Sequence, residues 1–224
     1  MMSERVRLKA EDGHELEAYV ARPIGAPIAG LVVVQEIFGV NAHVRSVADG
    51  YAKDGFLAVA PALFDRYERG VELRYEGADL QKAVSFVPKL DIDAAVRDTA
   101  AAIEYVRGET GTKCGVIGYC FGGTIAWLAA TRLKADAAVG YYGGRIGMFA
   151  AEKPQAPVML HFGKKDQHIP KEEVDTVAKA HPEVEIYWYE AGHGFNCDER
   201  ASYDAASAKL ARERSVEFLK NHLC

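Results

Sequence analysis

Residues 118–123, Gly-Tyr-Cys-Phe-Gly-Gly, constrain the fold of this chain more than any other stretch. The apolar run at residues 113–117 predicts a short buried strand before them, and residues 124–130 predict a helix after them. A reactive residue between glycines at a strand-to-helix turn is typical of a nucleophile elbow, whose backbone is strained. Here the central residue is Cys120 in place of the usual serine. Because a cysteine in a glycine-rich turn can also be a small apolar side chain, the motif needs catalytic partners.

Two residues further along the chain supply these partners in the order nucleophile, acid, histidine. Residues 157–163 predict a strand and Asp166 follows it; residues 185–189 predict the next strand and His193 follows in a glycine-flanked loop. Because the carboxyl ends of parallel strands meet at one edge of a sheet, the three side chains are expected within hydrogen-bond reach. The sequence therefore predicts Cys120 as nucleophile, His193 as base and Asp166 as the acid that orients it.

Strand and helix patterns alternate along most of the chain. Residues 5–8 and 16–20 flank an Asp-Gly pair and predict an antiparallel hairpin at a sheet edge. Apolar strands then alternate with helical stretches such as residues 43–53 and 92–107. This rhythm predicts a mostly parallel central sheet with helices on both faces and an antiparallel N-terminal edge. Together with the elbow and the order nucleophile, acid, histidine, it predicts the α/β-hydrolase fold. With no linker or low-complexity tract, residues 1–224 are expected to form a single α/β-hydrolase domain.

Composition argues against several classes of function. The net charge of −5, without a run of Lys or Arg, argues against a nucleic-acid partner. No basic and apolar leader begins the chain and no apolar run approaches the roughly 20 residues of a membrane span, so a cytoplasmic location without a membrane partner is expected. The four cysteines lack disulfide or metal spacing and are expected to be free thiols. No cofactor motif is visible, and a small-molecule substrate is the expected partner. The oligomeric state is left open, a monomer included.

The chain resembles the dienelactone hydrolase family, a cysteine-nucleophile branch of the α/β-hydrolases, over nearly its whole length. The matching motifs lie at residues 35–39, 118–123, 140–143, 165–170 and 192–195. The resemblance implies the same triad and adds Glu36 as an auxiliary carboxylate that contacts the cysteine in the resting state. It also implies carboxymethylenebutenolidase-like chemistry, in which a lactone of the dienelactone type is opened through a thioester to a maleylacetate-type product.

Two backbone N–H groups are expected to hold the oxyanion that forms when the thiolate attacks a carbonyl. One belongs to Phe121, directly after the nucleophile, and the other to Ile37, in the loop after the third strand. Removal of one such donor in other hydrolases costs roughly 10²–10³ in rate. His193 is then expected to activate the water that hydrolyses the thioester.

The pattern for substrate recognition departs from the family. Family members bind a substrate carboxylate with arginines, one of them four residues after the catalytic histidine, and here that position is Cys197. The other arginines that could replace it are Arg66, Arg69, Arg74 and Arg200. Loss of the guanidinium predicts weak or altered selectivity for anionic lactones.

Two alternatives to a dienelactone hydrolase stay open. The first is a broad carboxylesterase or thioesterase acting on uncharged acyl substrates, which the cysteine at position 197 favours. The second, from a different class, is a non-catalytic binding or redox-sensing protein in which Cys120 responds to oxidation. Such a sensor has no need of an acid and a histidine at the same sheet edge. Residues 62–88, polar and weakly patterned, are expected to wall or cover the site.

Overall fold

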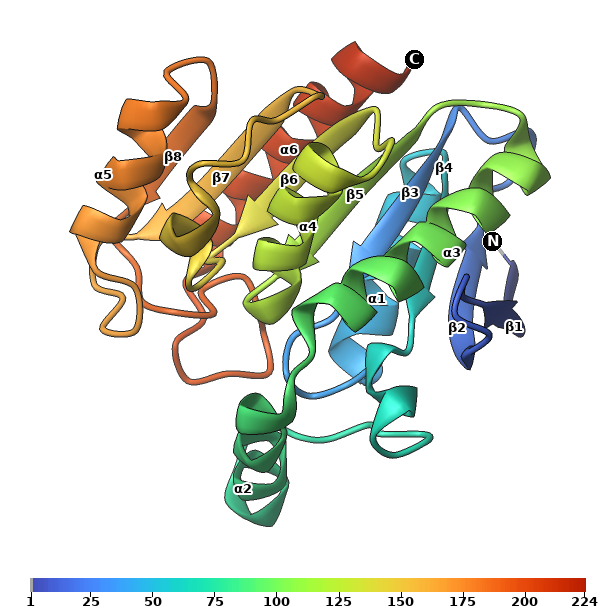
Figure 1. Ribbon diagram of the computed structural model, residues 1–224, viewed down its shortest axis with the longest axis horizontal. Helices are drawn as coiled ribbons and strands as arrows, with labels where there is room; N and C mark the ends of the chain where they lie inside the picture. The colour runs from blue at the N-terminus through green and yellow to red at the C-terminus, as the bar shows by residue number, and fades with distance from the viewer. Residues whose placement is uncertain (1) are drawn as a thin grey trace.

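A single mixed sheet organises the computed structural model, which describes residues 2–224 (Figure 1). Its strands are β1 (Met2–Lys9), β2 (Glu15–Arg22), β3 (Ala29–Val34), β4 (Phe56–Pro61), β5 (Cys114–Tyr119), β6 (Ala137–Tyr141), β7 (Val158–Gly163) and β8 (Glu185–Tyr189). They lie in the order β1-β2-β4-β3-β5-β6-β7-β8. The pairs β1–β2 and β2–β4 are antiparallel, and all later pairs are parallel. The predicted α/β-hydrolase sheet with its antiparallel N-terminal edge is confirmed.

Helices cover both faces of this sheet. They are α1 (Ala42–Lys53), α2 (Gly77–Phe86), α3 (Ile92–Thr110), α4 (Phe121–Arg132), α5 (Lys171–Ala180) and α6 (Ala205–Leu223). Figure 1 shows α3 and α4 in front of the sheet and α6 behind it. An ion pair of 2.6 Å between Arg212 of α6 and Asp54 at the end of α1 places these two helices side by side. Because both faces are covered, every residue of β3 to β7 is buried, which explains why these strands read as continuous apolar runs.

Capping side chains define where the helices begin. Asn41 accepts a hydrogen bond from the N–H of Val44 at the start of α1, and Asp91 and Asp204 do the same for α3 and α6. Each such cap stabilises the fold by about 1 kcal/mol. The cap on α1 also matters for the site, because Asn41 directly follows the loop that leaves β3.

The segment between β4 and α3 contains a helix that the sequence analysis did not predict. It forms a 3₁₀ turn (Leu63–Arg66), then α2, then a second 3₁₀ turn (Val87–Lys89). Figure 1 shows α2 projecting beyond the carboxyl ends of the strands. Only Ala83 and Phe86 of α2 are buried, so its apolar pattern is weak. The preceding stretch lies on the loop after β3, since the N–H of Leu73 donates to the Phe38 carbonyl.

Candidate active site

Cys120 occupies a strained turn between β5 and α4. Its φ of 54° and ψ of −118° place it in a region that side chains other than glycine rarely adopt. Two backbone hydrogen bonds hold the turn: the Cys120 N–H donates to the Tyr141 carbonyl (2.9 Å), and the Cys120 carbonyl accepts from the Gly123 N–H (2.8 Å). Strained backbone is often found at functional sites, where the surrounding structure maintains it.

Glycines next to Cys120 are required by the close approach of backbone atoms. A β-carbon at Gly118 would lie 1.8 Å from the Gly122 carbonyl oxygen. One at Gly122 would lie 2.4 Å from the Val34 oxygen and 2.6 Å from the Gln35 oxygen. The elbow is thus pressed against the end of β3, which brings the nucleophile turn beside the loop that carries Glu36 and Ile37.

We expect Gly122→Ala to destabilise the fold, because its β-carbon meets rigid backbone oxygens rather than a movable side chain. The expected loss is about 1–3 kcal/mol in the free energy of unfolding, measured by urea denaturation. Gly108→Ala is the matched control. This glycine lies inside α3 with open space around its β-carbon position, so the same substitution should stabilise by about 0.5–1 kcal/mol. Equal effects of the two changes would contradict the proposed crowding at the elbow.

The structure brings together the three side chains predicted to form a triad. His193 Nε2 lies 3.2 Å from Cys120 Sγ, and His193 Nδ1 lies 2.7 Å from Asp166 Oδ2. The other Asp166 oxygen accepts a 2.8 Å hydrogen bond from the His168 N–H. These residues lie in the loops after β5, β7 and β8. β7 and β8 are neighbours in the sheet, and β6 lies between β5 and β7. An imidazole held in this way can exchange a proton with the sulfur while the carboxylate orients its ring.

The electrostatics of this cluster favour charged forms. Burial by itself disfavours a charged His193, but the neighbouring Cys120 sulfur and the Asp166 carboxylate outweigh burial and raise the pKa of His193 to about 10. Burial likewise favours a neutral Asp166, yet the hydrogen bond and charge of His193 hold the Asp166 pKa below its usual value. The protonated form of His193, held beside the Asp166 carboxylate, is therefore favoured.

Glu36 is buried in the loop after β3, where its partner is Arg200. Its Oε1 lies 3.4 Å from Arg200 Nη1, and its Oε2 has no hydrogen-bond partner within residues 2–224. The resemblance implied a resting contact between Glu36 and Cys120. In the described part of the chain the hydrogen bonds differ from this expectation, since Cys120 Sγ pairs with His193 and Glu36 with Arg200.

The four arginines left open by the sequence have very different surroundings. Arg66 is held by two 2.7 Å hydrogen bonds to Asp98, and Arg74 is 83% exposed beside Asp79. Arg69 is also exposed, against the Glu15 carbonyl. Arg200 instead faces the site.

Arg200 is 21% exposed, and its guanidinium carbon lies 5.8 Å from the Phe38 ring and 5.7 Å from the Tyr75 ring. Its Nη1 would be only 2.6 Å from a β-carbon on Gly194, the residue after His193. The positive charge of Arg200 therefore lies close to the proposed reaction centre. The sequence did not indicate this location, because Arg200 lies outside every motif that matches the family.

The two predicted oxyanion donors lie on either side of the close approach between the elbow and the end of β3. Phe121 is the first residue of α4, and Ile37 follows Glu36 in the loop after β3. Neither N–H is used in a backbone hydrogen bond of residues 2–224. Gln35, which the sequence analysis did not single out, anchors this loop: its amide donates to the Glu36 carbonyl (3.2 Å) and accepts from the Leu63 N–H (3.1 Å).

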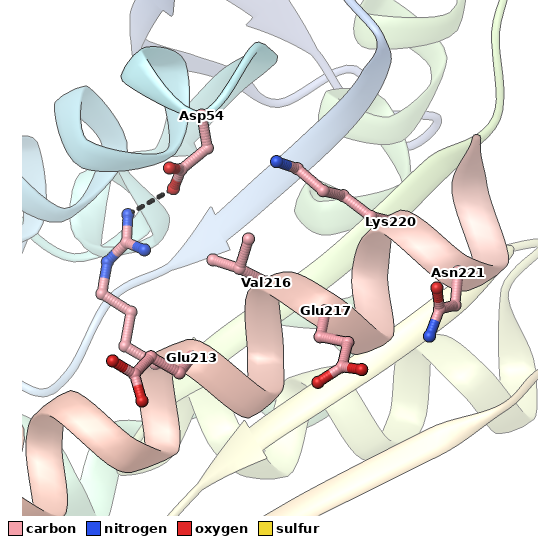
Figure 2. Close-up of a pocket in the computed structure, with 7 residues that line it drawn as sticks. Asp54, Glu213, Val216, Glu217, Lys220 and Asn221 are labelled. Carbon is pink, nitrogen blue, oxygen red and sulfur yellow. Dashed lines mark hydrogen bonds and ion pairs between the residues drawn. The ribbon is translucent and has the colours of Figure 1, made fainter.

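Open hollows of the surface also lie away from this cluster. One of about 490 Å³ runs between α6 and the end of α1 (Figure 2). Figure 2 shows the charged side chains of Asp54, Glu213, Glu217 and Lys220 along it. Arg212, which also lines it, pairs with Asp54 at 2.6 Å. None of its lining residues belongs to the loops of Cys120, Asp166 or His193, so this hollow is not the site of the triad cluster.

The sheet order, the elbow after β5 and the histidine loop after β8 define an α/β-hydrolase with cysteine at the nucleophile position. Residues 16–223 match the model of the dienelactone hydrolase family, and the chain belongs to this family. It is accordingly a hydrolase acting on ester or lactone bonds. Among the helices of residues 2–224, none combines the length and apolar character needed to cross a bilayer.

Known relatives share almost the full length of the chain. A carboxymethylenebutenolidase of Pseudomonas putida is 35% identical over 228 aligned residues, covering 98% of this chain and 97% of the relative. Carboxymethylenebutenolidase 1 of Cupriavidus pinatubonensis is 31% identical, with 98% and 97% covered. A crystal structure from Klebsiella pneumoniae subsp. pneumoniae, of a protein provisionally named a dienelactone hydrolase, superposes with a TM-score of 0.83. It is 30% identical and covers 97% of this chain and 98% of its own.

Proposed function

We propose that Cys120, His193 and Asp166 form a catalytic triad that hydrolyses a lactone or ester through a thioester. The observation that carries this proposal is the position of His193, 3.2 Å from the Cys120 sulfur and 2.7 Å from an Asp166 oxygen. A histidine that bridges a nucleophile and an orienting carboxylate has the geometry of acyl-transfer catalysis.

In the acylation half of the proposed reaction, the Cys120 thiolate attacks the carbonyl carbon and the carbonyl oxygen becomes an oxyanion. The N–H groups of Phe121 and Ile37 donate to that oxygen. The tetrahedral intermediate collapses, the C–O bond to the leaving group breaks, and His193 gives its proton to the departing alkoxide. In a lactone this oxygen stays tethered to the acyl group.

In the deacylation half, His193 removes a proton from water, and the hydroxide attacks the thioester carbonyl. The C–S bond breaks and Cys120 leaves as a thiolate, beside the imidazolium that His193 has become. Asp166 remains a carboxylate throughout, because its task is to orient the ring and stabilise the imidazolium. One water is consumed, and the product carries a new carboxylate.

For the substrate we propose a lactone of the dienelactone type that carries its own carboxylate, with Arg200 as the residue that binds it. Support comes from the location of Arg200 beside Glu36 and next to the His193 loop, whereas Arg66 is engaged by Asp98. The 3.4 Å Glu36–Arg200 contact is long for a charge-assisted hydrogen bond, so a substrate carboxylate can compete for the guanidinium. Glu36 is proposed as the auxiliary carboxylate that holds Arg200 until substrate arrives.

Arg200→Ala should lower kcat/KM for an anionic dienelactone. The expected loss of transition-state stabilisation is about 1.5–3 kcal/mol, the range for hydrogen bonds to a charged group. A neutral p-nitrophenyl ester should be affected much less, because it offers no carboxylate. Steady-state assays on both substrates measure this, and Arg74→Ala, at an exposed arginine, is the matched control. If wild type hydrolyses the neutral ester as well as the lactone and Arg200→Ala changes neither, the enzyme is a broad esterase and the dienelactone assignment is wrong.

The protonation state of His193 offers a second test. Because its pKa is raised to about 10, the imidazole should keep its proton through neutral pH and lose it only as the pH rises toward that value. Hydrolysis should decline over the same range as His193 ceases to protonate the leaving group. NMR titration of the imidazole measures the pKa directly. In Cys120→Ala the anionic neighbour is gone, so the pKa should fall; a titration near the ordinary value of about 6.5 in both proteins would contradict the proposed thiolate–imidazolium pair.

A further inference from the structure

A second cluster of side chains with metal-binding chemistry lies between α1 and the chain segment that follows His193. His43 is near the start of α1, and Cys197 and Asp198 precede α6. Their ligand atoms all lie within 4.8 Å of one another, and His43 Nδ1 is 2.9 Å from Asp198 Oδ1. No step of the proposed hydrolysis uses any of these three residues.

The cluster contains a polar group whose hydrogen-bonding capacity is not met. His43 and Cys197 are buried, while Asp198 is exposed. Within the part of the chain that the structure describes, His43 Nδ1 pairs with Asp198, and His43 Nε2 has no hydrogen-bond partner. Buried polar atoms without partners are rare, and a bound ion or water is a usual reason for them.

An ion can reach these residues from solvent. A hollow of about 370 Å³ opens beside the cluster, and its walls include His43, Asn196, Asp198 and Tyr203. Cys197 is buried and does not line this hollow, whereas the exposed Asp198 side chain does. The Asp198 side chain can therefore move to follow an entering cation without disturbing the core.

We propose that His43, Cys197 and Asp198 bind one Zn²⁺ ion. An imidazole nitrogen, a thiolate and a carboxylate oxygen are ligands that zinc prefers, and three protein ligands leave a fourth position for water. Tetrahedral bonds of zinc to these atoms require donor separations of roughly 3.2–3.7 Å. Rotation of the exposed Asp198 side chain can adjust the distances from its carboxylate to the other two ligand atoms. Hard cations such as Mg²⁺ and Ca²⁺ prefer oxygen ligands alone and should not compete.

The charge of such a site balances. When zinc binds, Cys197 gives up its thiol proton to solvent, so one thiolate and one carboxylate neutralise the two positive charges. Burial and the nearby Glu36 carboxylate raise the pKa of the Cys197 thiol to about 12, so the free energy of zinc binding must also cover deprotonation of this thiol. The bound ion would tie the segment between His193 and Arg200 to α1, and it would thereby restrain two residues of the proposed active site.

Zinc binding should be measured on the Cys120→Ala protein, because the Cys120–His193 pair could itself bind zinc. Isothermal titration with Zn²⁺ is expected to give one equivalent per chain, and Co²⁺ should produce a thiolate-to-cobalt absorption band. In this background, Cys197→Ser and His43→Gln should each weaken Zn²⁺ binding at least about tenfold. Loss of a residue that only supports a ligand weakens metal binding by about tenfold or more, and loss of a ligand itself should cost at least as much. Cys224→Ser, at an exposed cysteine, is the matched control and should bind zinc unchanged.

Absence of zinc binding to Cys120→Ala overturns the proposal, as does binding that neither Cys197→Ser nor His43→Gln weakens. Cys197 is buried, so its substitution could impair folding. Asp198→Ala changes an exposed side chain and avoids this difficulty. Tenfold weaker zinc binding by folded Asp198→Ala supports the site, and unchanged binding by that variant contradicts it.

Discussion

Cys120→Ala is expected to abolish hydrolysis, with a loss of roughly 10⁴-fold or more in kcat, because the variant retains no atom that can form the thioester. His193 and Asp166 would remain in place, but a histidine and a carboxylate alone provide only general-base assistance to water. The fold should be kept. Alanine is small enough for the elbow, and the backbone hydrogen bonds from Cys120 to Tyr141 and Gly123 do not involve the side chain.

The measurement is kcat/KM on a p-nitrophenyl ester and on dienelactone, with circular dichroism and thermal unfolding to verify the fold. Cys224→Ala serves as the control, because that cysteine is exposed at the end of the chain. In wild type, one equivalent of iodoacetamide at Cys120 should remove activity in parallel. Turnover by Cys120→Ala within tenfold of wild type would exclude Cys120 as the nucleophile and reopen the redox-sensing alternative.

The second large loss of activity is expected when either of the other two residues of the proposed triad is replaced. His193→Ala and Asp166→Asn should each reduce kcat by about 10⁴-fold, and the double variant should lose little more. The reason is geometric: His193 contacts both the sulfur at 3.2 Å and the carboxylate at 2.7 Å, so removal of either contact disables the same proton transfer. Asparagine at position 166 would also allow the wrong tautomer of the imidazole.

His168→Ala is the control for this experiment. The His168 ring lies 5.2 Å from the His193 ring, but its link to Asp166 is through the backbone N–H, which alanine keeps. A loss below about tenfold is therefore expected, as for an ordinary side-chain deletion near a site. Losses at His193 and Asp166 that multiply in the double variant would show two independent functions and would contradict a triad.

Local sequence patterns were sufficient for the order of the elements. The hairpin, the buried parallel strands and the helices near residues 43, 92 and 124 follow from periodicity, which depends on neighbours along the chain. Placement of Cys120, Asp166 and His193 at one edge followed as well, because the carboxyl ends of parallel strands must share an edge. In contrast, α2 has only two buried residues, and so weak an apolar pattern does not identify a helix.

Contacts between polar side chains far apart in the chain were decided by the tertiary structure alone. Glu36 and Arg200 are separated by 164 positions, and the sequence left four arginines equally open; packing engages Arg66 with Asp98 and turns Arg200 toward Glu36. The same holds for His43 and Asp198, 155 positions apart, whose approach depends on how α1 and the His193 loop pack at one side of the sheet.

The physical reason for this division is the range of the interactions. Backbone hydrogen bonds and the alternation of apolar side chains act between near neighbours, so local patterns were enough to predict the strands, the elbow glycines and the edge at which three reactive groups meet. An ion pair or a metal site requires two distant surfaces at a separation of a few ångströms. Only the packing of helices on the sheet sets that separation, and it places Arg200 beside Glu36 and His43, Cys197 and Asp198 close to one another.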